Sequence, residues 1–145
     1  MTSDVAVDSC VAVKWVIPEP DAALAQQVAD DTGLAGGRLV VLDLGLTEVA
    51  QALWKLFHRG LLPAHEVPGL FGQVVGRPVH VVPAQPLIPK AIELATRYDR
   101  SVYDCLFVAL AIDLSIAGVT SDEPLWKAVH ADHPQIHLLR DWPPP

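Results

Sequence analysis

Four acidic residues in this sequence have the type and placement needed to bind divalent cations. They are Asp8, Glu48, Asp104 and Asp122. Carboxylate oxygens are hard ligands, which select Mg²⁺ or Mn²⁺ rather than zinc. Such ions can activate a water molecule, align it with a phosphodiester and stabilise the charge that develops on the leaving oxygen. These residues therefore predict metal-dependent phosphodiester hydrolysis, with Mg²⁺ as the expected cofactor and Mn²⁺ as an alternative.

The elements that must position these acids alternate between short strands and helices. Strand-like runs rich in Val, Ile and Leu occur at 5–7, 38–42, 79–82, 116–120 and 136–139. Helical patterns are expected at 21–30, 46–57, 64–75, 87–98 and 102–114. This alternation predicts an α/β fold of three layers, in which helices cover both faces of a parallel sheet.

The predicted strands would bring the acids to one end of such a sheet. Asp8 follows the first run directly, and Asp122 lies just past the run that ends at Thr120. Ligands of open α/β sheets collect beyond the carboxyl ends of the strands, so neighbouring strands would bring these two carboxylates together. We expect Glu48 and Asp104 in the first turns of two helices that face the same end, the second helix being apolar nearly all round and therefore buried.

Each acid taken alone also has a simpler explanation. Asp122 is a suitable N-cap for a helix around 125–129, and the segment from Ser101 to Asp104 is a variant of the capping box. The helix dipole alone favours Glu48 in a first turn. Capping does not explain why the same placement recurs at four acids that could share a crevice. Without cations such a cluster is unfavourable, because the like charges repel and raise each other's pKa values.

Length and hydropathy favour one domain without a membrane segment. The 145 residues suit a single domain, which we place at 1–141, followed by a Pro-rich tail at 142–145 that we expect to be a loose extended end. The longest apolar stretch, 105–112, is far shorter than the roughly 20 residues that cross a bilayer. The first four residues lack the basic segment of a secretion signal. We expect a cytoplasmic protein.

The charge balance weakens a nucleic-acid-binding interpretation without excluding it. Ten basic and seventeen acidic residues give a net charge of −7, whereas nucleic-acid binders usually present a basic face. Two bound divalent cations would add four positive charges and reduce −7 to −3. At the site itself such ions would dominate the local field.

The segments around the acids resemble those of PIN-domain ribonuclease toxins of the VapC type. The similar segments lie in the family's order, at 7–15 followed by Pro18-Glu19-Pro20, then at 46–53, 103–111 and 119–125. The resemblance implies a sheet of about five parallel strands and metal-dependent cleavage of RNA. It also implies a homodimer that is neutralised by a cognate antitoxin, in a type II toxin–antitoxin system.

The resemblance assigns roles to individual residues. It implies catalytic and metal-ligand roles for Asp8, Glu48, Asp104 and Asp122, and supporting hydroxyl roles for Ser9 and Thr120. Phe107 stands where the family often has Tyr, so a hydroxyl contribution there is absent.

Other polar residues carry weaker expectations. Lys14 is our preferred candidate for a contact with RNA phosphates, ahead of Arg97, Arg100 and Lys127. The six histidines form no metal-binding signature such as HExxH. Cys10 and Cys105 lie close to the acids, but a buried cysteine usually behaves as a small hydrophobic residue, so we assign them no catalytic role.

Four alternative functions fit parts of the sequence less well. A haloacid-dehalogenase-like phosphatase needs a second Asp two residues after the first, where this chain has Cys10. A nucleotide-binding Rossmann domain needs a Gly-rich turn after the first strand, and 8–11 contains no glycine. A phosphorylation-receiver domain would need adjacent acids near the first strand and a late lysine after a strand, and this sequence supplies only Asp4 and Asp8 there. A PIN-like binding or scaffold protein without activity stays open, although the presence of all four acids weighs against it.

Overall fold

A five-stranded parallel sheet forms the centre of the fold in the computed structural model, which describes residues 3–145. The strands are β1 (Val5–Val7), β2 (Leu39–Leu42), β3 (Val79–Val82), β4 (Ala117–Thr120) and β5 (Ile136–Leu138). They are arranged in the order β3-β2-β1-β4-β5, and every neighbouring pair is parallel. The predicted α/β class and the number of strands are confirmed.

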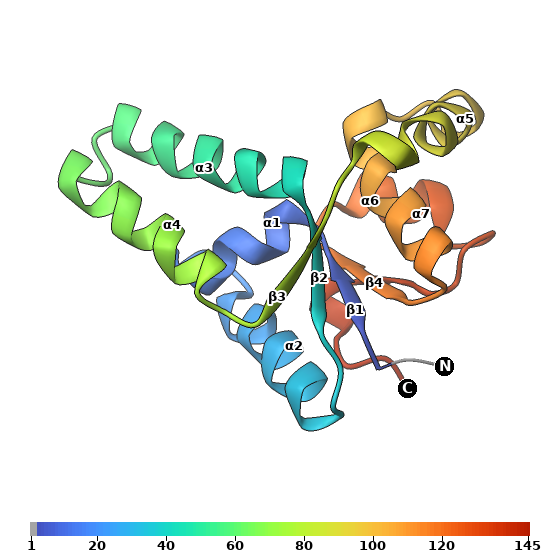
Figure 1. The fold of residues 1–145 in the computed structure, drawn as a ribbon, viewed down its shortest axis with the longest axis horizontal. Helices are drawn as coiled ribbons and strands as arrows, with labels where there is room; N and C mark the ends of the chain where they lie inside the picture. Colours follow the sequence, from blue (N-terminus) through green and yellow to red (C-terminus); the bar gives the residue numbers. More distant parts are fainter. Residues whose placement is uncertain (1–2) are drawn as a thin grey trace.

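Helices cover both faces of this sheet, as Figure 1 shows. They are α1 (Ser9–Ala12), α2 (Ala22–Leu34), α3 (Asp43–His58), α4 (Val67–Val75), α5 (Ile88–Tyr98), α6 (Val102–Leu114) and α7 (Glu123–Val129). Short 3₁₀ turns lie at Val13–Trp15, Ala64–Glu66, Gln85–Leu87 and Leu139–Asp141. Helices α1 to α4 pack on one face, and α5 to α7 pack on the other.

Successive residues of a strand point to opposite faces, which gives the protein two hydrophobic cores. In β1, Val5 and Val7 belong to the core beneath α1 to α4, whereas Ala6 belongs to the core beneath α5 to α7. Both faces are buried, so this strand is an uninterrupted apolar run rather than an alternating one. Helix α6 lies in the second core and is buried from Cys105 to Ala111, as its all-round apolar sequence predicted.

The order of the strands reverses between β1 and β4. From β1 the chain continues outwards through β2 and β3, and it then returns to the other side of β1 to form β4 and β5. In open α/β sheets the crevice at such a switch point, at the carboxyl ends of the strands, is where ligands bind. The backbone N–H of Asp8 donates to the carbonyl of Val119 at 3.1 Å, so the ends of β1 and β4 are held side by side there.

Two expectations about individual elements were wrong. Helix α3 begins at Asp43, whose Oδ1 accepts hydrogen bonds from the backbone N–H groups of Leu44 at 2.7 Å and Ala84 at 3.0 Å. Glu48 is therefore the sixth residue of its helix and not in the first turn. Trp142 is not part of a loose end, because it is half-buried and its indole Nε1 donates to Asp31 Oδ2 at 2.9 Å. The division into 1–141 and 142–145 stays a prediction.

Within residues 3–145, no helix combines the length and the apolar character that crossing a membrane requires.

Candidate active site

Asp8 lies at the point where the first strand ends and the first helix begins. It is the N-cap of α1, and its Oδ1 accepts from the backbone N–H of Ser9 at 2.9 Å. Its Oδ2 accepts from the hydroxyl of Thr120, on the neighbouring strand β4, at 2.7 Å. The hydroxyl oxygen of Thr120 in turn accepts from the backbone N–H of Asp122 at 3.1 Å. The supporting position predicted for Thr120 therefore corresponds to a direct contact with Asp8.

Asp104 and Asp122 both lie at helix starts, and the capping explanations are confirmed as contacts. The Ser101 hydroxyl accepts from the backbone N–H of Asp104 at 3.1 Å at the start of α6. Asp122 is the N-cap of α7, and its Oδ1 accepts from the backbone N–H of Leu125 at 3.0 Å. Because that cap uses only one of the two carboxylate oxygens of Asp122, it does not prevent the other from binding a ligand.

The negative charges of the acids influence one another. Burial raises the pKa of Asp8 from 3.8 to about 6; hydrogen bonds from Thr120, Cys10 and Ser9 oppose this rise, and the charge of Asp104 adds to it. Burial, followed by the charges of Asp8 and Asp104, also raises the pKa of Glu48, from 4.5 to about 6.

Asp104 shows the same effect. Its pKa is raised by burial and by the charge of Asp122, and this rise is opposed by the hydrogen bond with Ser101 and the charge of Arg100. Each of the four acids therefore lies within electrostatic range of at least one of the others.

No ion pair among the described residues neutralises these charges. Within residues 3–145, the Lys and Arg side chains that form ion pairs contact Asp4, Glu19, Glu93, Glu123 and Asp132. None of them contacts a site acid. The same part of the chain contains no group of three or more Asp, Glu, His or Cys side chains close enough to hold one ion. The donor set suits a hard cation, but binding one would require the side chains to be drawn together.

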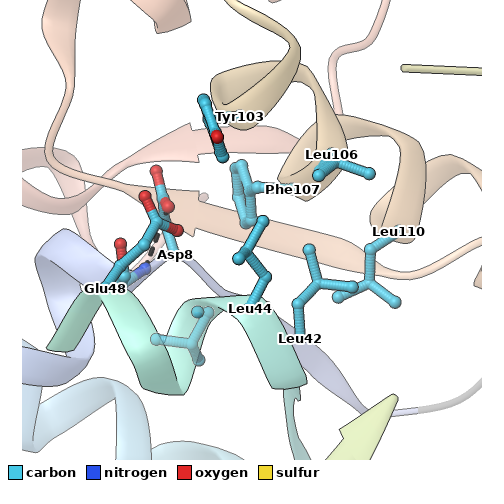
Figure 2. A pocket seen from close by; sticks show the side chains of 11 residues that line it. Asp8, Leu42, Leu44, Glu48, Tyr103, Leu106, Phe107 and Leu110 are labelled. Atoms are coloured by element: carbon cyan, nitrogen blue, oxygen red, sulfur yellow. Dashed lines mark hydrogen bonds between the residues drawn. The ribbon is translucent and has the colours of Figure 1, made fainter. Parts of the chain in front are cut away.

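The carboxylates of Asp8 and Glu48 share a narrow pocket, which is shown in Figure 2. Glu48 reaches it from α3, while Tyr103 and Phe107 approach from α6 on the opposite side. Asp104 and Asp122 do not line this pocket, although they lie at the same end of the sheet. Phe107, which stands where the family often has Tyr, is only 3% exposed and belongs to the core.

Lys14 has a structural role that the sequence did not predict. Its Nζ donates to the carbonyl of Pro20 at 2.9 Å and lies 3.8 Å from Glu19 Oε2, with only 11% of the side chain exposed. These contacts hold the segment that precedes α2. Lys14 does not line the pocket of Asp8 and Glu48, and its position gives the predicted contact with RNA no support.

The two thiols do not have the character of nucleophiles. Burial raises the pKa of Cys10 to about 12 and that of Cys105 to about 11, so both are protonated at neutral pH. The Sγ of Cys10 lies 3.6 Å from Thr120 Oγ1 and accepts from the backbone N–H of Ser121 at 3.4 Å. Cys10 therefore packs behind Asp8.

Tyr103 is the residue of this region that sequence reasoning missed. It is 64% exposed and lines the pocket, although it belongs to a helix whose sequence is apolar nearly all round. In such a helix no polar stripe indicates which side chain faces solvent. The only available signal was its position beside Asp104 in the first turn.

Comparison with known proteins identifies the family. The PIN domain model matches residues 5–129. Ribonuclease VapC3 of Pyrobaculum aerophilum is 28% identical over 121 residues, which cover 82% of this chain and 89% of that protein.

Two solved structures share the fold. PAE2754 from Pyrobaculum aerophilum has a TM-score of 0.70 at 19% identity, covering 94% of this chain and 90% of that one. VapBC2 from Rickettsia felis, which was solved bound to a DNA fragment from their promoter, has a TM-score of 0.64 at 13% identity, covering 93% and 96%. The match to the family model spans all four acids, and it confirms the resemblance seen in the segments around them. The chain belongs to the PIN-domain family.

Proposed function

We propose that this protein is a divalent-metal-dependent endoribonuclease and the toxin of a type II toxin–antitoxin pair. The observation that carries the proposal is the meeting of Asp8 and Glu48 in one pocket with no ion-pair partner among residues 3–145. Similarity to ribonuclease VapC3, at 28% identity over most of both chains, supports RNA as the substrate.

The four acids would divide the work of holding cations. Asp8, Asp104 and Asp122 are the proposed main ligands, and Glu48 would bridge the cations or hold their bound water from the α3 side of the pocket. Mg²⁺ or Mn²⁺ bound there would supply a Lewis acid that activates water and stabilises charge on the phosphodiester. Thr120 would orient Asp8, because its hydroxyl fixes one oxygen of the carboxylate. Ser9 would fix the other oxygen through its backbone N–H, and the supporting role of its hydroxyl stays a prediction.

The electrostatics of the pocket support cation binding. Two carboxylates whose pKa values are raised to about 6 are destabilised as anions by burial and by the charges of neighbouring acids. A divalent cation relieves this cost, so part of its binding free energy comes from repulsion that already exists in the metal-free protein. Above pH 6 both groups are mainly ionised and ready to bind.

The proposal extends to partners. The fold is shared with VapBC2 from Rickettsia felis, and we expect a cognate antitoxin for this chain as well. Several large apolar side chains are exposed on α3, on α5 and in the turn after α3, and they would suit a protein interface: Trp54, Phe57, Leu61, Ile88 and Ile92. A homodimer and a cytoplasmic location stay predictions.

The test combines cleavage with a binding measurement. Wild type is incubated with total bacterial RNA in Mg²⁺, in Mn²⁺ and in EDTA, and its melting temperature is recorded as Mn²⁺ is added. Asp104→Asn removes one site charge, and Asp113→Asn removes an exposed acid from the other end of the same helix as a control. We expect cleavage only with a cation, and a Mn²⁺-induced rise in melting temperature that Asp104→Asn loses and Asp113→Asn keeps.

One observation favours a second candidate, a PIN-like binding protein without catalytic activity. The described residues contain no ready-made group of three metal ligands. This candidate predicts no response of the melting temperature to Mn²⁺ and no difference between Asp104→Asn and Asp113→Asn. A dehalogenase-like phosphatase is no longer competitive, because the chain matches the PIN domain and Cys10 stands where that chemistry needs a second acid.

A further inference from the structure

Arg100 lies in the short link between α5 and α6, beside the candidate active site. Its backbone N–H donates to the carbonyl of Ala95 at 3.3 Å, and the preceding Asp99 has a left-handed backbone with φ of 52°. Ser101, which follows, is the N-cap of α6. These contacts fix the backbone of Arg100 relative to Asp104 in the first turn of that helix. The charge of Arg100 reaches the carboxyl of Asp104, whose pKa it lowers.

The other cations that the sequence offered for RNA phosphates are occupied away from the acids. Lys14 holds the segment that precedes α2, whereas Arg97 and Lys127 form ion pairs with acids outside the site. Between residues 3 and 145, Arg100 forms no ion pair, and this includes Asp104. Of the four candidates, Arg100 is therefore the cation whose charge acts on the site and is not already paired.

A buried donor of Arg100 also has no partner. The side chain is half-buried, and its Nε is shielded from solvent without a hydrogen bond to any residue that the structure describes. Such unsatisfied groups are rare in folded proteins, so this one requires an explanation. Helix dipoles do not supply it, because the end of α5 favours a cation here and the start of α6 disfavours one. An anionic oxygen is the acceptor that a guanidinium binds most strongly.

A phosphate group is the anion that suits this position. Next to four carboxylates an approaching anion is repelled, unless it also binds the cations that those carboxylates hold. Phosphate oxygens are good ligands for Mg²⁺ and Mn²⁺. The planar fork of a guanidinium can also donate to two oxygens of one phosphate. A carboxylate from a partner protein would be the other acceptor, but it gives the cations no bond to cleave.

We propose that Arg100 is a catalytic residue that binds the phosphate of the bond to be cleaved, from the α6 side, and stabilises its negative charge in the transition state. The inference rests on the proposed ribonuclease function and adds a cationic side chain to the four acids. In the hydrolysis the oxygen of water bonds to phosphorus, and the bond from phosphorus to the leaving oxygen breaks. One proton of the water ends on the leaving oxygen, and the other stays on the new phosphate or passes to solvent. Arg100 exchanges no proton, because a guanidinium stays charged, and it acts by electrostatic attraction alone.

The first measurement tests the phosphate contact apart from cleavage. Uridine 5′-monophosphate and uridine are each titrated into the protein in saturating Mn²⁺ and followed by calorimetry. Wild type should bind the monophosphate more tightly than the nucleoside, and Arg100→Ala should weaken binding of the monophosphate about tenfold without affecting uridine. Arg97→Ala, which removes an exposed cation three positions earlier, should behave as wild type. Arg100→Gln keeps more of the packing of the side chain and replaces Arg100→Ala if that variant does not fold.

The second measurement follows cleavage of a labelled RNA in Mg²⁺. Arg100→Ala should lower kcat about a hundredfold and change KM little, because the contact strengthens in the transition state. Added guanidinium ion should restore part of the activity, and the same concentration of sodium chloride should not. Arg100→Lys keeps the charge but loses the planar fork, so its kcat should lie between those of wild type and Arg100→Ala. All variants should keep the Mn²⁺-induced rise in melting temperature, which would fall if Arg100 only held Asp104 in place.

The outcomes separate this inference from the ribonuclease proposal. If the Arg100 variants weaken binding of the monophosphate but wild type cleaves no RNA with Mg²⁺ or Mn²⁺, the phosphate contact stands and the ribonuclease proposal fails. If wild type cleaves RNA and Arg100→Ala cleaves it at the same rate, the inference is overturned. It is also overturned if wild type binds the monophosphate no better than uridine, or if the variants lose the response to Mn²⁺. The same holds if they keep phosphate binding and lose only a co-expressed antitoxin.

Discussion

The hydroxyl of Thr120 donates a 2.7 Å hydrogen bond to Oδ2 of Asp8, although the two residues are 112 positions apart in the sequence. They meet because β1 and β4 are parallel neighbours, paired from Val5 to Val7. Thr120 is fully buried, and its hydroxyl oxygen also accepts from the backbone of Asp122. One side chain therefore fixes the relative positions of two of the proposed metal ligands.

Replacing Thr120 by Val should weaken the site without changing the shape of the side chain. The substitution removes the donor to Asp8 and leaves the N–H of Asp122 without its acceptor, which should destabilise the fold by about 1 to 3 kcal/mol. The Mn²⁺-induced rise in melting temperature should also become smaller, because the carboxylate of Asp8 is no longer oriented. Urea unfolding with and without Mn²⁺ measures both effects.

The matched control is Thr120→Ser, which keeps the hydroxyl and loses one methyl group. It should respond to Mn²⁺ as wild type does, with only a modest loss of stability from the small cavity. Equal Mn²⁺ responses from the Val and Ser variants would mean that Thr120 is a core residue with no part in orienting ligands.

The stability of the metal-free protein should depend on the ionisation of Asp8 and Glu48. Their pKa values in the fold, about 6, lie above the ordinary values of 3.8 and 4.5, so the folded state binds protons more tightly than the unfolded chain. The stabilisation that these two groups add to the folded state is complete below about pH 4 and is lost as the pH rises through 6. For Asp8 the loss by neutral pH is roughly 3 kcal/mol.

The measurement compares wild type with Asp8→Asn in EDTA, by urea unfolding at about pH 5 and about pH 7.5. The comparison is needed because burial lowers the pKa values of His133 and His137, which act in the opposite direction over the same range. The stability of Asp8→Asn relative to wild type should increase with pH. A difference that stays constant between these two pH values would contradict the electrostatic description of the pocket.

Substitutions of Asp122 separate its capping role from its proposed ligand role. Asn is as good an N-cap as Asp, so Asp122→Asn should keep the bond to the N–H of Leu125 and the stability of the fold. It should reduce the affinity for Mn²⁺, because an amide carries no charge. Asp122→Ala should lose both, at a cost of about 1 kcal/mol from the cap. Titration of all three proteins with Mn²⁺, followed by melting temperature, would show whether Asp122 is a cap alone.

Much of this arrangement could be predicted from the sequence, because the strands and the buried helix are short apolar runs with clear ends. The position of Asp8 after β1 required only the end of the run Val5-Ala-Val7. The convergence of Asp8 and Asp122 could be predicted only on the assumption that β1 and β4 are neighbours, because long-range pairing decides which strands are adjacent. In the structure the two strands are paired.

Other features depend on tertiary contacts that no local pattern reveals. Helix α3 begins earlier than its apolar periodicity indicated, because Asp43 bonds to the backbone of Ala84, which is 41 residues away. Lys14 has the sign expected for RNA binding, but its partner is the carbonyl of Pro20. In a sequence, a Lys or Arg that binds a loop carbonyl cannot be distinguished from one that binds a ligand. Tyr103 was overlooked because its helix is apolar nearly all round, so only the fold shows that this side chain lines the pocket.

Helix α6 carries Asp104, and its distance from the sheet depends on the absence of a side chain at Gly118. A Cβ at this position of β4 would lie 2.9 Å from Phe107 Cζ, 3.0 Å from Ile136 Cδ1 and 3.3 Å from Ala111 Cβ. Gly118→Ala should therefore destabilise the protein by about 1 to 3 kcal/mol through overpacking and displace α6. Because Asp104 moves with the helix, the Mn²⁺ response should fall as well. Gly33→Ala is the control, since its Cβ would meet nothing within 4 Å and it lies within α2, where Ala is favoured over Gly by up to about 1 kcal/mol. If Gly118→Ala has wild-type stability and an unchanged Mn²⁺ response, the placement of Asp104 does not depend on the close packing of α6 against β4.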